Sequence, residues 1–259
     1  MRGMHEAQSG ASVAELFSIM RRLLAPDGCP WDRAQSPETL RPFVIEEAFE
    51  VVEAIDAGSE PQLREELGDL LLQIVFLTEM AESFGPDDVV RGICDKMVRR
   101  HPHVFADAEA DTPEQVLESW DAIKAREKGK RDRGALDGVP VALPALARAV
   151  AVGKKARKIN LDWPDAAGPR AKIDEELAEL DAAPDHEAEE AELGDLLFAI
   201  ASWARHRGHD PEAALRGTLR RFGERVRVME TKAGEEGVEL GALSPEDIDA
   251  RWNAAKAQR

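Results

Sequence analysis

Apolar residues along the chain recur every three to four positions, which is the spacing of amphipathic helices. The most apolar stretch runs from Glu65 to Phe76 (EELGDLLLQIVF) and predicts a helix from about Pro61 to Ser83. This stretch is apolar nearly all round, which is typical of a buried helix. Valine and isoleucine seldom alternate with polar residues, so strands are not predicted. The pattern therefore indicates an all-α fold.

Capping residues and turn signals divide the rest of the chain into further helices. Helices are predicted over residues 12–24, 36–58, 87–100, 112–128 and 146–158, and from Ser244 onward. The composition of residues 26–32 (PDGCPWD) predicts a loop, and residues 1–10 are predicted to be a disordered tail.

The second half of the chain repeats the first. Glu192–Ile200 (ELGDLLFAI) lies 126 positions after a similar stretch, Glu66–Ile74 (ELGDLLLQI). Trp252 follows Trp120 by 132 positions, and Arg220 and Arg221 are matched to the basic pair Arg99 and Arg100 at an offset of 121. Such a spread of offsets is expected from a duplication followed by drift in the loops. We predict two similar helical domains, residues 1–134 and 135–259, separated by a charged, glycine-bearing stretch.

Each half carries two pairs of carboxylates, and the members of a pair are three positions apart, on one helix face. The pairs are Glu47 with Glu50 and Glu66 with Asp69 in the first half, and Glu176 with Glu179 and Glu192 with Asp195 in the second. Short linkers make the two helices of each half antiparallel neighbours, so four carboxylates converge. Their mutual repulsion is relieved by a divalent cation. Oxygen-only ligands favour Mg²⁺ or Mn²⁺, which leave coordination positions for substrate phosphates.

The simplest alternative is that these carboxylates form solvated helix faces in an acid-rich chain. Leu67, Leu70 and Leu71 flank one pair, which a solvated face would not predict. Gly68 and Gly194 lie inside their helices at a cost of up to about 1 kcal/mol relative to alanine, which suggests close backbone approach.

The charge of the chain restricts its partners. A formal net charge of −17 argues against binding to nucleic acid and to anionic membranes. A small phosphorylated substrate stays possible because metal ions bridge acidic groups. The basic residues Lys158, Lys172, Arg221 and Arg225 could neutralise a triphosphate, and Trp252 could stack on a base, although a solvated face or core packing are the ordinary alternatives. With no signal peptide and no apolar run long enough to span a membrane, a cytoplasmic protein is expected.

Four segments of the chain form a recognisable set of motifs: Gly28–Asp32 (GCPWD), Glu46–Glu50 (EEAFE), Glu66–Leu71 (ELGDLL) and Arg99–Phe105 (RRHPHVF). Together they resemble the MazG nucleoside triphosphate pyrophosphohydrolases in their two-repeat form. The acidic motifs also occur in the related dimeric dUTPases and phosphoribosyl-ATP pyrophosphohydrolases. The segment Arg99–Phe105 and the tandem repeat are more specific to MazG.

The resemblance implies an all-α bundle that forms a homodimer through its helices and hydrolyses NTP or dNTP, canonical or damaged, to NMP and pyrophosphate with Mg²⁺. It implies that all eight paired carboxylates bind metal and that Glu176, Glu179, Glu192 and Asp195 are catalytic, because the C-terminal copy is often the active one. By position it also implies that Lys172, Arg221, Arg225 and Trp252 contact the nucleotide. The stretch Glu187–Ala191 (EAEEA) departs from relatives that carry a lysine there.

Two alternatives stay open from the sequence. One is a dUTPase-like enzyme with a narrow base preference, and the other is a non-catalytic helical interaction or regulatory protein. A carboxylate-bridged di-iron bundle is disfavoured because its Glu-x-x-His motif does not occur in the sequence.

Overall fold

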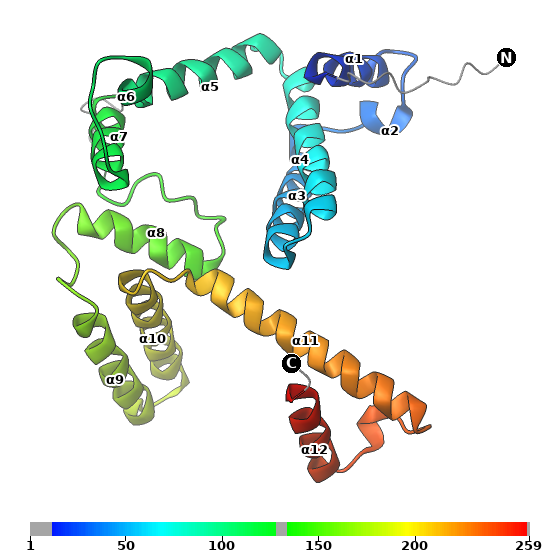
Figure 1. The fold of residues 1–259 in the computed structure, drawn as a ribbon, viewed down its shortest axis with the longest axis vertical. Coiled ribbons are helices and arrows are strands. Elements are labelled where there is room, and N and C mark those ends of the chain that lie inside the picture. The colour runs from blue at the N-terminus through cyan, green and yellow to red at the C-terminus, as the bar shows by residue number, and fades with distance from the viewer. Residues whose placement is uncertain (1–11, 128–133, 258–259) are drawn as a thin grey trace. The chain divides into compact units, whose positions relative to one another are not determined.

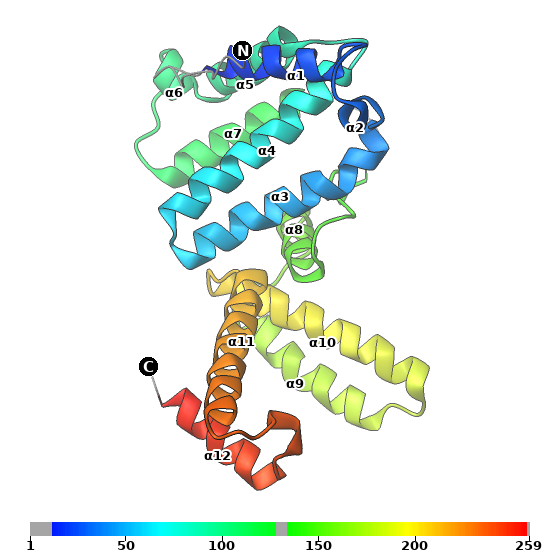
Figure 2. The same cartoon turned by 90° about the vertical axis from the view of Figure 1, so that its right-hand side faces the viewer.

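The computed structural model describes residues 12–127 and 134–257, apart from the side chain of Ala125. It confirms an all-α fold, since every regular element among these residues is a helix. The helices form two compact units, residues 1–131 and 132–259, each described below by itself (Figures 1 and 2). The predicted boundary after residue 134 stays a prediction, and the predicted tail over residues 1–10 lies outside the described residues. No helix of the described residues is both long and apolar enough to cross a bilayer.

Unit 1 contains seven helices in its described part. They are α1 (Val13–Leu24), α2 (Pro30–Arg33), α3 (Pro37–Ala57), α4 (Glu60–Met80), α5 (Pro86–Arg100), α6 (Pro102–Phe105) and α7 (Pro113–Glu127). The prediction of a loop over residues 26–32 is wrong in part, because Pro30 begins the single turn of α2, where its fixed φ angle and missing N–H are tolerated.

The core of unit 1 lies where α1 and α3 pack against the C-terminal half of α4. Phe17, Met20, Leu40, Val75 and Phe76 are buried together there. Ser36 and Thr39 form a capping box at the start of α3, and Gly58 ends the helix with a φ of +65°, which favours glycine. Because only Gly58 and Ser59 separate α3 from α4, the two helices form an antiparallel hairpin that aligns their carboxylates.

Unit 2 repeats this hairpin. Its helices are α8 (Ala145–Arg157), α9 (Ala167–Ala182), α10 (His186–His206), α11 (Pro211–Glu235), the 3₁₀ turn η1 (Leu240–Ala242) and α12 (Pro245–Lys256). The α9–α10 hairpin packs against α8, and α12 folds back on the far end of α11. Small residues such as Ala199, Ala201 and Ala204 line the buried face of α10, so neighbouring helices approach closely.

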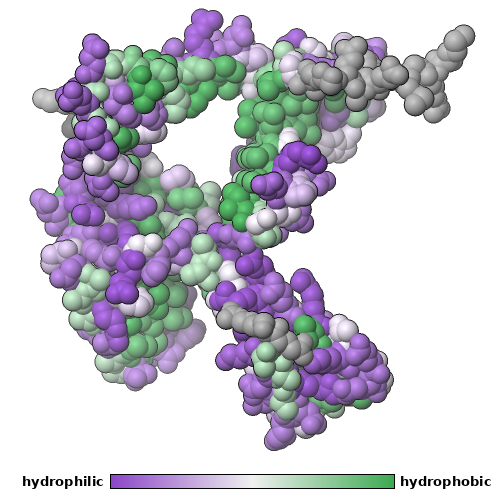
Figure 3. All heavy atoms as spheres, in the orientation of Figure 1, coloured by the Kyte–Doolittle hydropathy of each residue, from purple (hydrophilic) through white to green (hydrophobic). Residues whose placement is uncertain are grey.

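The prediction that the stretch Glu65–Phe76 is buried all round is wrong within unit 1. Leu67 is 50% exposed and Ile74 is 46% exposed, because the contacts of α4 with α1, α3 and α5 leave these two side chains uncovered. Leu193 and Leu197 of α10 are each 47% exposed. Figure 3 shows the apolar residues gathered along both hairpins. Each unit therefore presents an apolar helix face without a partner among the described residues of that unit.

The expected close approach at the two helical glycines is also not found within a unit. A Cβ atom placed on Gly68 or on Gly194 would meet no described atom within 4 Å. The surface at both glycines is therefore open.

Candidate active site

The carboxylates of unit 2 converge between α9 and α10. Glu176, Glu179 and Glu192 each offer an oxygen, and these three atoms lie within 4.8 Å of one another. Glu176 is only 3% exposed, and its Oε2 atom has no hydrogen-bond partner among the described residues. A buried carboxylate oxygen without a partner is unfavourable, so the cluster fits a group that supplies positive charge.

Lys172 lies one turn before Glu176 on α9 and supplies part of that charge. Its Nζ is 2.6 Å from Glu176 Oε1, 2.9 Å from Glu175 Oε1 and 3.9 Å from Glu179 Oε2. The hydrogen bond from Lys172 lowers the pKa of Glu176 below its usual value and outweighs the opposing effect of burial. The hydrogen bonds to Glu175 and Glu176 in turn raise the pKa of Lys172. Glu176 is therefore held ionised at neutral pH.

Glu192 behaves in the opposite way. Burial raises its pKa, and the negative charge of Glu179, the hydrogen bond with Glu176 and the charges of Glu176 and Asp195 raise it further. Asp195 is outside the group of three oxygens but acts on Glu192 electrostatically. The structure thus brings together three of the four predicted ligands and places the fourth nearby.

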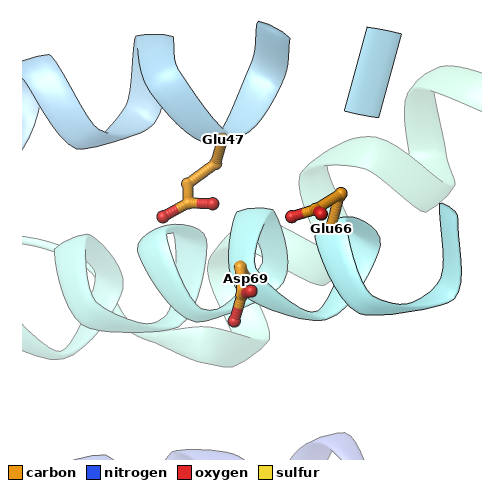
Figure 4. Close-up of side chains that lie close together, drawn as sticks. All are labelled: Glu47, Glu66 and Asp69. Atoms are coloured by element: carbon orange, nitrogen blue, oxygen red, sulfur yellow. The ribbon is translucent and has the colours of Figure 1, made fainter. Parts of the chain in front are cut away.

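Unit 1 has a similar cluster without the lysine. Glu47 extends from α3 toward α4, which carries Glu66 and Asp69 (Figure 4), and their oxygens also lie within 4.8 Å of one another. Burial raises the pKa of Glu47, and the charges of Asp69 and Glu50 raise it further. Burial and neighbouring carboxylates raise the pKa of Glu66 as well. Phe43 stands four positions before Glu47, where unit 2 has Lys172 before Glu176.

Two of the three predicted nucleotide-binding residues of α11 and α12 meet one another. Arg225 lies over the ring of Trp252 with its Cζ 5.3 Å from the centroid, and the ring of Phe222 is 5.0 Å from that of Trp252. An apolar cavity of about 550 Å³ opens beside Phe222 and Trp252. Arg221 donates from Nη2 to the hydroxyl of Thr218 at 3.0 Å.

The structure changes which arginine of unit 2 corresponds to Arg100 of unit 1. In unit 1, Arg100 lies over Trp120 with its Cζ 5.8 Å from the centroid, as Arg225 does over Trp252. Aligning the helix starts Pro86 and Pro211 also pairs Arg100 with Arg225. The structure therefore favours Arg225, and not Arg221, as the counterpart of Arg100.

Within one copy of unit 2 the two parts of the predicted site are separate. Arg225 lies in the second half of α11 and Trp252 lies on α12, and Figures 1 and 2 both show α12 apart from α9 and α10. Lys158 caps the C-terminus of α8 and is exposed, and its role stays a prediction.

A buried ionic network, which the sequence did not predict, supports the hairpin of unit 2. Arg205 at the end of α10 donates to both oxygens of Asp162 at 2.9 and 2.7 Å, and the Nε2 atom of His206 lies 3.1 Å from the same carboxylate. Burial alone would raise the pKa of Asp162, but these two partners lower it to about 2. Arg205 passes directly over Gly153 of α8, where a Cβ would lie 2.8 Å from Nε. The partners are 43 and 44 positions apart, so no local sequence signal reveals them.

Comparisons with known proteins identify the family of the chain. Residues 35–105 match the MazG nucleotide pyrophosphohydrolase domain. A protein of Thermotoga maritima named nucleoside triphosphate pyrophosphohydrolase/pyrophosphatase MazG is 42% identical over 252 residues, which cover 96% of this chain and 97% of the relative. The chain belongs to the MazG family.

Two further relatives are similar over most of this chain. A nucleoside triphosphate pyrophosphohydrolase of Escherichia coli K12 is 39% identical over 256 residues, covering 95% of this chain and 97% of that protein. An uncharacterized protein of Bacillus subtilis, YabN, is 44% identical over 246 residues, covering 92% of this chain and 50% of that protein. Membership of the MazG family confirms the prediction of a hydrolase and disfavours the non-catalytic interaction protein.

Proposed function

We propose that the chain hydrolyses nucleoside triphosphates to the monophosphate and pyrophosphate, and that unit 2 does so with Mg²⁺. The observation that carries this proposal is the convergence of Glu176, Glu179 and Glu192 around a buried oxygen of Glu176 that has no partner. The names of the full-length relatives support the reaction.

The donor set fits a hard divalent cation. Glu176, Glu179, Glu192 and Asp195 would hold it, since all four offer carboxylate oxygens and no His or Cys joins the cluster of described residues. Bound Mg²⁺, or Mn²⁺ in its place, would supply Lewis-acid polarisation of the phosphoryl group. The homologous set Glu47, Glu50, Glu66 and Asp69 would hold a cation in unit 1.

The chain's own residues would position the substrate and move the proton. Lys172, which already lies beside the carboxylates, would pair with a phosphate oxygen once a cation takes its place among them. A glutamate would accept the proton of the attacking water. Pyrophosphate then leaves.

A second copy of the chain would complete the site. Arg221, Arg225 and Trp252 are separated from the carboxylates within one copy of unit 2, although a nucleotide has to touch both groups. The apolar faces of α9 and α10, including Leu177, Leu193 and Leu197, are open to a partner helix. We therefore propose a homodimer in which the α11–α12 arm of one copy supplies these residues to the carboxylates of the other.

The base preference is open between a broad enzyme that accepts canonical or damaged nucleotides and a dUTPase-like enzyme. The cavity beside Trp252 is lined almost wholly by apolar side chains, with Asp249 the exception. Apolar walls discriminate weakly between bases of similar size, which favours the broader enzyme.

The decisive experiment measures pyrophosphate release over a panel of canonical and damaged NTPs and dNTPs. Release should require Mg²⁺ and disappear with EDTA. Two inactive variants, Glu176→Gln and Arg225→Ala, should regain part of the activity when they are unfolded and refolded together, because a mixed dimer has one intact shared site. Absence of release from every nucleotide would refute the hydrolase, whereas release without recovery on mixing would refute only the shared site.

A further inference from the structure

Two neighbouring arginines at the end of α5 share one carboxylate in unit 1. Arg99 donates from Nε to Glu127 Oε1 at 2.6 Å, and Arg100 donates from Nε and Nη2 to Oε2 at 3.0 and 2.5 Å. Glu127 is the last described residue of α7, so the contact joins the ends of two helices. One carboxylate thus accepts three hydrogen bonds from two guanidinium groups.

The groups around the arginines are basic or aromatic. The side chain of Arg100 is only 15% exposed and lies against Trp120. The ring of His101 meets the same tryptophan edge-on at 4.8 Å and lies 5.7 Å from the ring of His103. The buried Nδ1 atom of His103 has no hydrogen-bond partner among the described residues. Glu127 is the only carboxylate that pairs with either arginine in the described part of the chain. A concentration of cationic donors around one anion is typical of a phosphate-binding site.

In unit 2, Arg225 corresponds to Arg100 but has no carboxylate of the described residues beside it. Arg225 lies over Trp252 as Arg100 lies over Trp120, yet no carboxylate pairs with Arg225 among the described residues. The position 132 residues after Glu127, by the offset that relates Trp120 to Trp252, is Arg259, which is not acidic. Guanidinium groups bind carboxylates and phosphates with the same forked geometry. Glu127 therefore occupies the place that an external anion would take.

We propose that Arg99, Arg100 and His103 form a second anion site, for a pyrophosphate group, and that the carboxylate of Glu127 keeps it closed. The group can be free pyrophosphate or the end of a nucleotide, since both present the same oxygens. This site is in unit 1 and does not take part in the hydrolysis proposed for unit 2. Its binding can be measured whether or not the chain hydrolyses nucleotides.

Binding of inorganic pyrophosphate to the full chain, by calorimetry in EDTA, tests this proposal. EDTA removes the divalent cations that would recruit pyrophosphate to the carboxylate clusters. Glu127→Gln keeps the side-chain size but removes the competing charge, and should bind pyrophosphate at least tenfold more tightly than the unchanged chain. Glu118→Gln is the matched control, because Glu118 is an exposed carboxylate on the same helix. Adding Arg100→Ala to Glu127→Gln should abolish the gain.

Equal affinities of the Glu127→Gln and Glu118→Gln variants would overturn the proposal, since the effect would then be one of net charge. Should Glu127→Gln unfold, as circular dichroism would show, Glu127→Asp provides the second variant. Its shorter side chain should weaken the hydrogen bonds with both arginines and give a smaller gain in affinity for pyrophosphate. No gain in affinity would again overturn the proposal. Parallel titrations with ATP and with sulfate identify the source: ATP binding as tightly as pyrophosphate indicates a nucleotide tail, and pyrophosphate alone indicates the free ion. Equal binding of sulfate would show that the site does not recognise pyrophosphate.

Discussion

The first carboxylate of the acidic cluster is in opposite electrostatic states in the two units. In unit 2, Lys172 lies 2.6 Å from Glu176 and lowers its pKa. In unit 1 the corresponding position is Phe43, and the pKa of Glu47 is raised by burial and by its acidic neighbours. One residue, a turn before the cluster, thus decides whether the first carboxylate is stabilised before any cation binds. The difference supports the proposal that unit 2 is the unit that hydrolyses the nucleotide.

The largest expected effect is on catalysis by the two clusters. Glu176→Gln should lower pyrophosphate release at least roughly a thousandfold, because it removes a ligand that no other residue replaces. The matched change Glu47→Gln should alter release less than twofold. Steady-state rates at saturating Mg²⁺ measure both. Comparable losses in the two variants would mean that the units share the catalytic work.

The next effect is on stability and concerns the ion pairs that support the two hairpins. Asp162→Asn should lower the free energy of unfolding by about 3 kcal/mol, because it leaves Arg205 buried without its counter-ion. Arg21→Ala breaks the pair with Glu79 in unit 1 and should lower the free energy of unfolding by at most about 1 kcal/mol, since Arg21 is 57% exposed. Urea denaturation followed by circular dichroism compares them. If the two variants unfold at the same urea concentration, the two ion pairs contribute equally to stability and the predicted difference is wrong.

Substitution of Lys172 should have a smaller effect on catalysis. Lys172→Met should reduce kcat/KM roughly ten- to hundredfold, the loss expected for one charge-assisted hydrogen bond of about 1.5–3 kcal/mol. Lys154→Met, which removes an exposed lysine of α8, is the control and should be nearly neutral. Initial rates over a range of ATP concentrations separate kcat from KM. A loss no greater than that of the control would show that Lys172 does not hold phosphate.

The smallest expected effect is the dependence of stability on pH. The pKa of Asp162 is about 2 in the folded chain and 3.8 in its ordinary state. Its contribution is therefore complete above about pH 4 and is lost as the pH falls toward 2, by about 2 kcal/mol in total. Urea midpoints between pH 5 and pH 2 should show this slope in the unchanged chain and a shallower one in Asp162→Asn. If the urea midpoints of the unchanged chain and of Asp162→Asn fall equally with pH, Asp162 is not the cause of the pH dependence.

The sequence predicted the elements well because the signals are local. Ser12, Ser36 and Ser244 cap the expected helices, and the spacing of Glu176 and Glu179 already placed both on one face. What could not be predicted depends on contacts between distant segments. The pairing of Asp162 with Arg205 and that of Glu127 with Arg99 leave no periodic pattern in the sequence. The exposure of Leu67 was missed for a related reason, since an apolar pattern does not reveal whether the covering surface belongs to the same unit.

The ion pairs at the ends of α4 and α10 also bear on how the chain folds. Two similar hairpins in one chain can exchange helices during folding, which is a common error of repeat proteins. Glu79 and Arg205 stand at matching positions of the repeat, 126 residues apart, but carry opposite charges. If α10 took the place of α4, Arg205 would face Arg21, and if α4 took the place of α10, Glu79 would face Asp162. Both misassembled hairpins place like charges together, so the divergence of the two copies protects each from pairing with the wrong half.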